Sequence, residues 1–463
     1  MHDYEQALKF GGGMPDTFLS PSAIILTSLA ILLIFLLPRR HVVVPIIVTS
    51  FFITMGQQLV LGGLHFYVSR LLVLAAWIRV LGCGWHREYH PSRIDNAILF
   101  WGVLDAVAFV ALWHEPEALI NRLGFLYNLL GFYFLFRLLL QNSRDVDRTI
   151  KSFAAVCFPL ALSMINEKFT SRNLFWVFGG VPQFTAVREG SLRAQGPFAH
   201  PILAGTFGAM LLPLFVWLYW QKRRSRWIAF VGVTSALVMV FASSSSTPLM
   251  AVAAGVLGFS LWPLRRWMRI LRWGLVLMLL GLHIVMKAPV WALIARVEVV
   301  GGSSGDHRYE LVNQFIRHFG DWWLLGTKYT EDWGYLMHDV SNQYVSVGIE
   351  GGILGFSLFL WIMTCCFQDL GDARKSRLST LEDKKRLWSL GTALFACLTA
   401  FFGITFFDQT AIGWYALLAM IASSSRLYRA PRRTIPQVAD EVPLDVDVSS
   451  ASYHPLTSTW KLI

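Results

Sequence analysis

The chain has 463 residues, of which 55% are hydrophobic and 15% are charged, and its formal net charge is +11. Soluble globular domains are usually about 45–50% apolar and about 25% charged, so this composition excludes a disordered chain, a collagen-like repeat and a small disulfide scaffold. Apolar residues run along nearly the whole length, which argues against a soluble enzyme with one terminal anchor. We therefore predict an all-α, polytopic integral membrane protein.

A bilayer core about 30 Å thick requires roughly 20 apolar residues per helix. Long uncharged runs favour helices over a β-barrel, in which apolar and polar residues alternate. We predict about 12–13 transmembrane helices, in chain order near residues 22–37, 42–62, 64–82, 96–113, 122–141, 152–165, 201–220, 227–242, 248–263, 273–293, 342–365, 388–407 and 411–425.

Lysine and arginine collect in alternate loops, which predicts the orientation of the chain. The N-terminus is expected in the periplasm and the C-terminus in the cytoplasm. Two large segments, about 166–200 and the late loop 287–341, then lie on the periplasmic side. Most of the positive charge reflects this topology, so it does not indicate a nucleic-acid partner. We expect residues 1–430 to form the membrane domain and the polar tail 431–463 to be disordered.

The first outer segment ends in a basic cluster just before a predicted span. The chain runs from Arg188 through Arg193 to His200, with Gly196-Pro197 between the last two. Such a turn lets backbone approach a ligand closely, and the following helix N-terminus attracts anions. Arginine's planar fork matches phosphate oxygens. We predict an anion site here, in preference to arginines that reach lipid headgroups.

The short outer loop 243–247 reads Ser-Ser-Ser-Ser-Thr. Its hydroxyl groups suit a sugar or a phosphate, but they equally suit a simple turn that caps the next helix. We favour the simple turn.

The second outer segment begins with a Gly/Ser stretch and continues as a predicted amphipathic helix. Asp306 is the expected N-cap, and the following apolar residues recur at helical spacing: Leu311, Val312, Phe315, Ile316 and Phe319. This stripe predicts a helix on the membrane or over a cavity. Arg308, at the helix start, is expected to face an anionic ligand. Trp322 and Trp323 are expected in the membrane interface.

Polar residues gather again where the chain enters the next span. His338 precedes that entry. Taken by itself it favours a histidine bonded to a headgroup or a carbonyl, and the alternative is a general base or proton carrier, which an imidazole can supply. Asn342 follows, and Glu350 lies about two turns inside the span, where an ionisable group is costly and usually functional. Arg70, near the outer end of an earlier span, is expected to join an outward-facing basic cavity.

These residues resemble a bacterial family of membrane glycosyltransferases, the O-antigen ligases and O-antigen polymerase-like enzymes. The resemblance covers about residues 188–355. It rests on the block Arg193-Ala-Gln-Gly-Pro-Phe-Ala-His200-Pro before a span, the Ser-rich loop two spans later, and, in the late loop, Leu324–Gly326, His338 with Asn342-Gln-Tyr, and Glu350-Gly351. The family often has an arginine beside the Ser-rich loop, where this chain has Thr247-Pro248.

The resemblance implies a GT-C-like, multi-pass protein of the bacterial inner membrane that moves a glycan from an undecaprenyl-diphosphate donor to an acceptor sugar. It implies no metal, no cofactor and no nucleotide sugar. Matched by position, Arg193 and Arg308 would bind the diphosphate and His338 would be the base, and Arg188 is a weaker match. Arg70 lies outside the matched region and is a further candidate for the diphosphate because of its place near the outer end of a span.

We expect His200, Asn342 and Glu350 to lie around the acceptor. The expected partners are the lipid-linked glycan, a lipid or glycan acceptor and membrane lipids; other polysaccharide-assembly proteins are left open.

The sequence does not separate a ligase, which transfers polymer to a lipid-sugar acceptor, from a polymerase, which extends the polymer. A transporter or flippase for lipid-linked glycans is the alternative from another class. It predicts charges within the spans and an internal repeat, whereas the polar clusters here lie in outer loops. A non-catalytic assembly subunit of a polysaccharide secretion system is a third interpretation.

Overall fold

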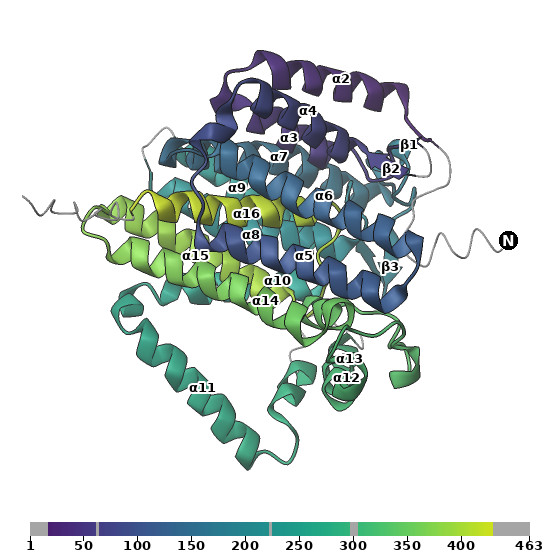
Figure 1. The fold of residues 1–463 in the computed structure, drawn as a ribbon, viewed down its shortest axis with the longest axis vertical. Coiled ribbons are helices and arrows are strands. Elements are labelled where there is room, and N and C mark those ends of the chain that lie inside the picture. Colours follow the sequence, from purple (N-terminus) through teal and green to yellow (C-terminus); the bar gives the residue numbers. More distant parts are fainter. Residues whose placement is uncertain (1–16, 62–63, 222–224, 297–303, 429–463) are drawn as a thin grey trace, which may run out of the picture. The chain divides into compact units, whose positions relative to one another are not determined.

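The computed structural model describes residues 17–61, 64–221, 225–296 and 304–428. It is mostly helical, with short 3₁₀ segments between the helices (Figure 1). The helices are α2 (Pro21–Leu36), α3 (Val43–Phe52), α4 (Val68–Gly82), α5 (Arg93–Trp113), α6 (Pro116–Leu139), α7 (Ser143–Thr170), α8 (Pro201–Tyr219), α9 (Ser225–Ala242), α10 (Ser246–Ser260), α11 (Met268–Val285), α12 (Ser304–Arg317), α13 (Phe319–Trp322), α14 (Gln343–Lys375), α15 (Leu381–Ala400) and α16 (Asp408–Arg426).

Two antiparallel hairpins complete the fold. One pairs β1 (Gln58–Leu61) with β2 (Leu64–Tyr67), and the other pairs β3 (Ala186–Arg188) with β4 (Ser191–Arg193). The predicted tail, residues 431–463, lies outside the described residues, as does most of the segment before the first helix.

Seven of the described helices are long and apolar enough to cross a membrane: α5, α6, α7, α8, α9, α11 and α14. The apolar helices α2 and α10 are shorter. A mostly helical chain with several candidate membrane-spanning helices is therefore confirmed, while the higher number of spans stays a prediction.

The predicted spans 42–62 and 64–82 are partly wrong. The first helix of the pair ends at Phe52, and the β1–β2 hairpin occupies the residues between it and α4. Within the hairpin, Leu59 pairs with Phe66 and Val60 with His65. Short apolar runs with β-branched and aromatic residues fit a strand as well as a helix, so hydropathy alone could not separate the two.

Helix α8 lies at the centre of the bundle, against α7, α9, α10, α15 and α16. Its glycines allow this close packing: a Cβ at Gly208 would lie 2.8 Å from the Ala236 carbonyl oxygen of α9. Phe207 of α8 stacks on Phe51 of α3, with ring centroids 4.4 Å apart, and also contacts Phe198. This aromatic cluster lies directly below the turn that precedes α8.

The late outer segment folds on its own small core. Leu311 and Phe315 of α12 are buried, and Phe315 stacks on Trp322 at a centroid distance of 4.0 Å. Met337 and Val345 belong to the same cluster. Of the predicted apolar stripe, Leu311 and Phe315 face this core, whereas Ile316 and Phe319 are exposed. Trp322, which was predicted in the membrane interface, is buried because Phe315 stacks on it.

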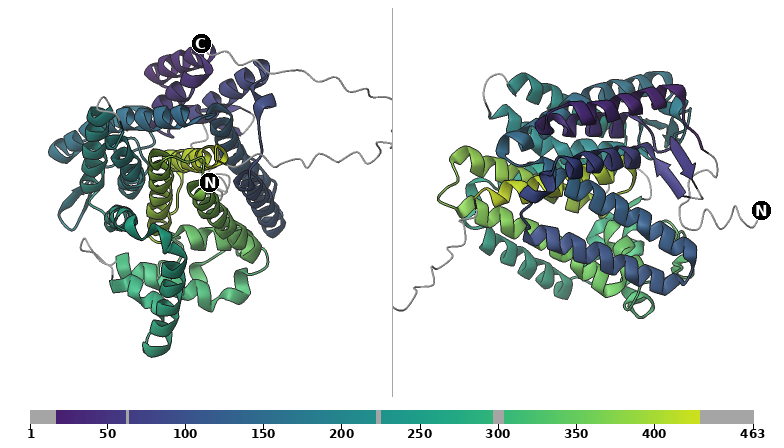
Figure 2. Two further views of the ribbon diagram at one scale, coloured as in Figure 1. Left: turned by 90° about the vertical axis from the view of Figure 1, so that its left-hand side faces the viewer. Right: turned by 45° about the horizontal axis from the view of Figure 1, so that its top comes forward.

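Three outer features lie at the same end of the helix bundle. The β1–β2 and β3–β4 hairpins and the α12–α13 segment are found at the right-hand end in Figure 1, and the tilted view in Figure 2 agrees. Helix α12 begins at Ser304, so Asp306 lies in its first turn and is not the N-cap. This end of the bundle collects most of the residues that the sequence singles out.

Candidate functional site

The turn between β4 and α8 is held by buried side chains. Glu167, near the end of α7, accepts hydrogen bonds from the backbone N–H groups of Gln195 (3.1 Å) and Gly196 (2.9 Å). Asn173 donates its side-chain amide to the Gly196 carbonyl at 2.7 Å. Gly196 has φ +56°, a conformation that glycine adopts without strain. These hydrogen bonds fix the conformation of the backbone after Arg193.

Helix α16 supports the same turn from the other side. Gln409 donates to the Pro197 carbonyl at 3.1 Å, and Asp408 accepts from the Ala199 N–H at 2.7 Å. His200 then accepts the Ile202 N–H at 3.2 Å and caps α8. His200 was expected around the acceptor; its Nδ1 serves as a helix cap.

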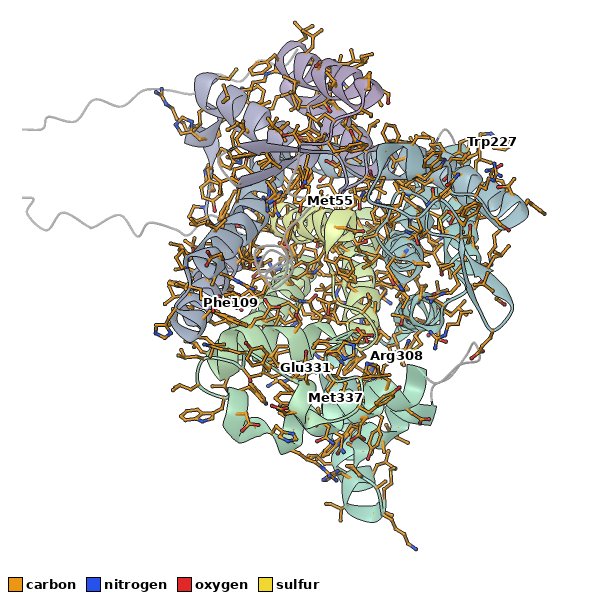
Figure 3. All side chains as sticks on the ribbon, turned by 90° about the vertical axis from the view of Figure 1, so that its right-hand side faces the viewer. Met55, Phe109, Trp227, Arg308, Glu331 and Met337 are labelled. Atoms are coloured by element: carbon orange, nitrogen blue, oxygen red, sulfur yellow. The ribbon has the colours of Figure 1, made fainter. Side chains whose placement is uncertain are left out.

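Two arginines from distant parts of the sequence meet at the Ser-rich turn. Arg193 Nη2 donates to Ser245 Oγ at 2.8 Å, and Arg308 Nη2 donates to Thr247 Oγ1 at 2.9 Å. Both side chains are more than nine-tenths buried. Ser245 is the N-cap residue of α10 and Thr247 lies in its first turn, so both guanidinium groups reach one helix N-terminus. Figure 3 shows Arg308 where the late segment meets the bundle.

A third cation contacts the same turn. Lys168 donates to Ser244 Oγ at 2.6 Å and also to the Leu192 carbonyl, one residue before Arg193. Lys168 lies in the last turn of α7, where a basic residue is common, so its position in the sequence gave no signal of a site. The prediction of a simple turn at residues 243–247 is incomplete. The hydroxyls of that turn instead join three basic side chains from three separate segments.

Glycine makes room for this convergence. A Cβ at Gly403 would lie 3.0 Å from Arg308 Nε and would overlap the Thr247 hydroxyl. A Cβ at Gly205 of α8 would overlap the Ser243 side chain and lie 2.7 Å from Pro248. Any larger residue at these positions has to displace the Ser-rich turn or the arginine.

Arg193 carries a positive charge that the described residues do not neutralise. Within the described part of the chain, no carboxylate forms an ion pair with Arg193, and its buried Nε has no hydrogen-bond partner. Burial lowers the pKa of Arg193, and the neighbouring Arg188 lowers it further. No side chain caps α10 among those residues, so its first-turn N–H groups add partial positive charge. The arrangement suits an anion.

The pKa of His200 depends on the charged groups around it. Burial lowers the pKa of His200 to about 4, Arg193 and Arg188 lower it, and Asp339 opposes them. The Asp339 carboxylate, just before α14, is therefore near enough to the N-terminus of α8 to act on His200. Asp339 also accepts a hydrogen bond from His307 through its carbonyl, at 3.1 Å.

His338 is exposed beside Asp339. Among the described residues its side chain has no hydrogen-bond or ion-pair partner, so the imidazole is free to meet a ligand from solvent. His338 can act as a base only on an acceptor that binds beside this exposed imidazole.

Asn342 has a structural position next to the site. Its side-chain oxygen accepts the N–H groups of Tyr344 (2.9 Å) and Val345 (3.2 Å) and so caps α14. Its amide donates to the Phe402 carbonyl at 3.4 Å, one residue before Gly403. Asn342 therefore positions the backbone that packs against Arg308.

Glu350 belongs to a different cluster. Arg122 of α6 donates to Glu350 Oε2 at 2.8 Å and to the buried Asp105 of α5 at 3.1 Å, and Ser346 donates to Glu350 at 2.9 Å. The prediction that Glu350 lies around the acceptor is not supported by these contacts, because the carboxylate is taken up by an ion cluster between helices. An acidic residue within a predicted span, Asp105, was the available signal.

Arg70 is also placed elsewhere. Its Nε donates to Asn128 of α6 at 3.1 Å and its Nη1 to the His65 carbonyl at 2.6 Å. These contacts join α4 to α6 and to the β1–β2 hairpin. Ser245 and Thr247, which bind Arg193 and Arg308, make no hydrogen bond with Arg70 in the described part of the chain, so these contacts do not bring Arg70 to the basic cluster.

No protein-family model and no curated protein sequence matches the chain. The resemblance to O-antigen ligases therefore depends on the residues themselves. Within the described residues, no group of three or more His, Cys, Asp or Glu side chains could hold a metal ion.

Proposed function

We propose that the chain is a membrane glycosyltransferase that acts on a lipid-diphosphate glycan donor at the periplasmic face of the bacterial inner membrane. The convergence of Arg193 and Arg308 on the first turn of α10 is the observation that carries this proposal. Two buried forked cations and a helix N-terminus form a site for a multiply charged anion, and a diphosphate presents the matching oxygens.

The proposed reaction is a displacement at the sugar's anomeric carbon. The acceptor hydroxyl oxygen forms the new glycosidic bond, the bond from that carbon to the diphosphate oxygen breaks, and the diphosphate leaves with the electron pair. His338 takes the acceptor proton. Because charge builds on the departing diphosphate, the arginines stabilise the transition state more than the ground state.

The exposure of His338 fits this scheme, since the acceptor would arrive from the rim while the donor enters from the membrane. We further propose a GT-C-like arrangement with about 12–13 spans, a periplasmic N-terminus and a cytoplasmic C-terminus. The undecaprenyl-linked glycan, an acceptor sugar and membrane lipids are the proposed partners. Ligase and polymerase activities remain two forms of this proposal, which differ in the acceptor.

A lipid-linked glycan transporter is the second candidate. The ion cluster of Asp105, Arg122 and Glu350 favours it, because charges between spanning helices often mark a transport path. A second charged pair, Arg137 with Asp95, is fully buried. However, Asp95 also accepts hydrogen bonds from Tyr89 (2.8 Å) and Tyr133. Such complete pairing is typical of structural charges, so we favour the transferase.

The test is glycan transfer by purified protein, with an undecaprenyl-diphosphate glycan, an acceptor and EDTA. We expect transfer by the wild type and its loss in Arg193→Ala, Arg308→Ala and His338→Ala. Arg308→Lys should also impair transfer, because a point charge does not replace the fork. Arg317→Ala is the matched control, since Arg317 is an exposed arginine on the same helix as Arg308.

Full transfer by all three alanine variants would refute the site. Movement of the labelled donor across vesicle membranes without transfer would instead support the transporter. In cells, accumulation of single lipid-linked repeat units after deletion would indicate a polymerase, and accumulation of long lipid-linked polymer would indicate a ligase.

A further inference from the structure

A groove between α4 and α6 has an apolar lining. Its volume is about 540 Å³, and its lining includes Val73 and Trp77 from α4 and Tyr127, Leu130 and Phe134 from α6. Leu123, which also lines the groove, is 57% exposed on a helix long and apolar enough to span a bilayer. The groove therefore opens toward the membrane and offers a continuous surface for hydrocarbon.

One end of the groove carries a positive charge. Arg70 lies three residues before Val73 on α4, and its Nη2 would be 2.8 Å from a Cβ at Gly124 of α6. The guanidinium group thus crosses from one helix to the other at the outer end of the apolar lining. Glycine at position 124 leaves the space that the charged group occupies.

The charge of Arg70 has no acidic partner among the described residues. Its nitrogens Nε and Nη1 donate to an amide and a carbonyl, which are neutral, and Nη2 makes no hydrogen bond within the described part of the chain. Burial lowers the pKa of His65, and Arg70 lowers it further, as an uncompensated cation does. A cation near a membrane interface without a carboxylate attracts an anionic headgroup.

The length of the groove matches one leaflet. The lining residues on α6 run from Leu123 to Phe134, and eleven steps of about 1.5 Å give about 16 Å. Half of a hydrocarbon core about 30 Å thick is about 15 Å. A single acyl chain of the outer leaflet can therefore lie along the groove with its headgroup at Arg70.

We propose that this groove binds an anionic glycerophospholipid, with one acyl chain between α4 and α6 and the phosphate against Arg70. This site is separate from the basic cluster at α10, because Arg70 contacts α6 and the β1–β2 hairpin, whereas Arg193 and Arg308 bind Ser245 and Thr247 at the start of α10. The lipid fastens α4 to α6 at the outer face. The proposal does not depend on the transferase proposal.

The test is native mass spectrometry of the purified full-length protein, titrated with phosphatidylglycerol or with phosphatidylcholine. The wild type should retain one phosphatidylglycerol more tightly than any phosphatidylcholine. Arg70→Gln should weaken that binding about tenfold or more, which corresponds to one charge-assisted contact with phosphate. Arg79→Gln is the matched control, because Arg79 lies on the same helix near its other end and contacts the Ile34 carbonyl and the Trp85 ring.

A second variant keeps the charge and fills the groove. Leu123→Trp adds bulk at an exposed lining position and should also weaken phosphatidylglycerol binding. Equal retention of the lipid by wild type, Arg70→Gln and Leu123→Trp would overturn the proposal, as would equal losses in Arg70→Gln and Arg79→Gln. Displacement of the phospholipid by an undecaprenyl diphosphate would also overturn it and assign the groove to the donor.

Discussion

Gly403→Ala is the most direct perturbation of the basic cluster, because it adds one methyl group beside Arg308 without changing any charge. The new Cβ would lie 3.0 Å from Arg308 Nε, while ordinary contact begins at 3.4 Å. The guanidinium group must therefore retreat by about 0.4 Å, and the Thr247 hydroxyl, which the methyl overlaps, must move further. A misplacement on the order of 1 Å can cost about 100-fold in rate. We expect glycan transfer to fall by about 10- to 100-fold.

The assay compares the transfer rates of four purified proteins at saturating donor: wild type, Gly403→Ala, Thr247→Ala and the double variant. Both single changes act through the same bond between Thr247 and Arg308. The two losses should therefore not multiply in full: the double variant should lose less than the product of the single losses, although the new methyl still displaces Arg308 directly. Gly320→Ala is the control, since a Cβ there has nothing within 4 Å.

Wild-type transfer by Gly403→Ala, with the protein folded and abundant, would refute the assignment of Arg308 to the donor. Fully multiplicative losses would show that the two positions act independently, which contradicts the geometry on which the site depends.

Three further predictions concern stability. Arg122→Met should cost about 3–5 kcal/mol in unfolding free energy, because it leaves the buried Asp105 without its ion partner, and adding Asp105→Asn should recover a large part. His200 has a pKa of about 4 in the folded protein and an ordinary value of 6.5, so the unfolded chain takes up the proton first. The wild type should therefore lose stability as pH falls from 6.5 toward 4, and His200→Asn, which keeps a capping side chain, should remove that loss. Gly326→Ala should cost at least about 2 kcal/mol, because Gly326 has φ +102° and a Cβ would overlap the Ile349 carbonyl.

Thermal unfolding in detergent measures all three. For the ion cluster, additive losses in the double variant would contradict the pairing. For His200, the same pH slope in the variant would assign the loss to other groups. For Gly326, the control is again Gly320→Ala. Equal unfolding midpoints for the two variants would show that the late segment does not need the close contact between Gly326 and the Ile349 carbonyl.

The two arginines of the candidate site could be predicted from the sequence, because basic residues are unusual in the segments where they lie. Arg193 and Arg308 stand out as basic residues in outer segments, against the positive-inside trend, and the Gly196-Pro197 turn marks close backbone approach. These signals are local. Glu350 and Arg70 stood out because each is a charged residue in an apolar segment. Such a residue needs a partner, but the sequence does not say which one. In the structure Glu350 pairs with Arg122, and Arg70 binds Asn128.

By itself the sequence determined that the chain is mostly helical and contains several helices long and apolar enough to cross a membrane, because hydrophobic length acts along the chain. The tertiary structure decided which charges meet. Ser245, Thr247 and Lys168 join the arginines only through the packing of α7, α8 and α10, where glycine positions such as Gly205 and Gly403 permit contact. Such contacts depend on distances between segments far apart in the chain, and no local pattern encodes them.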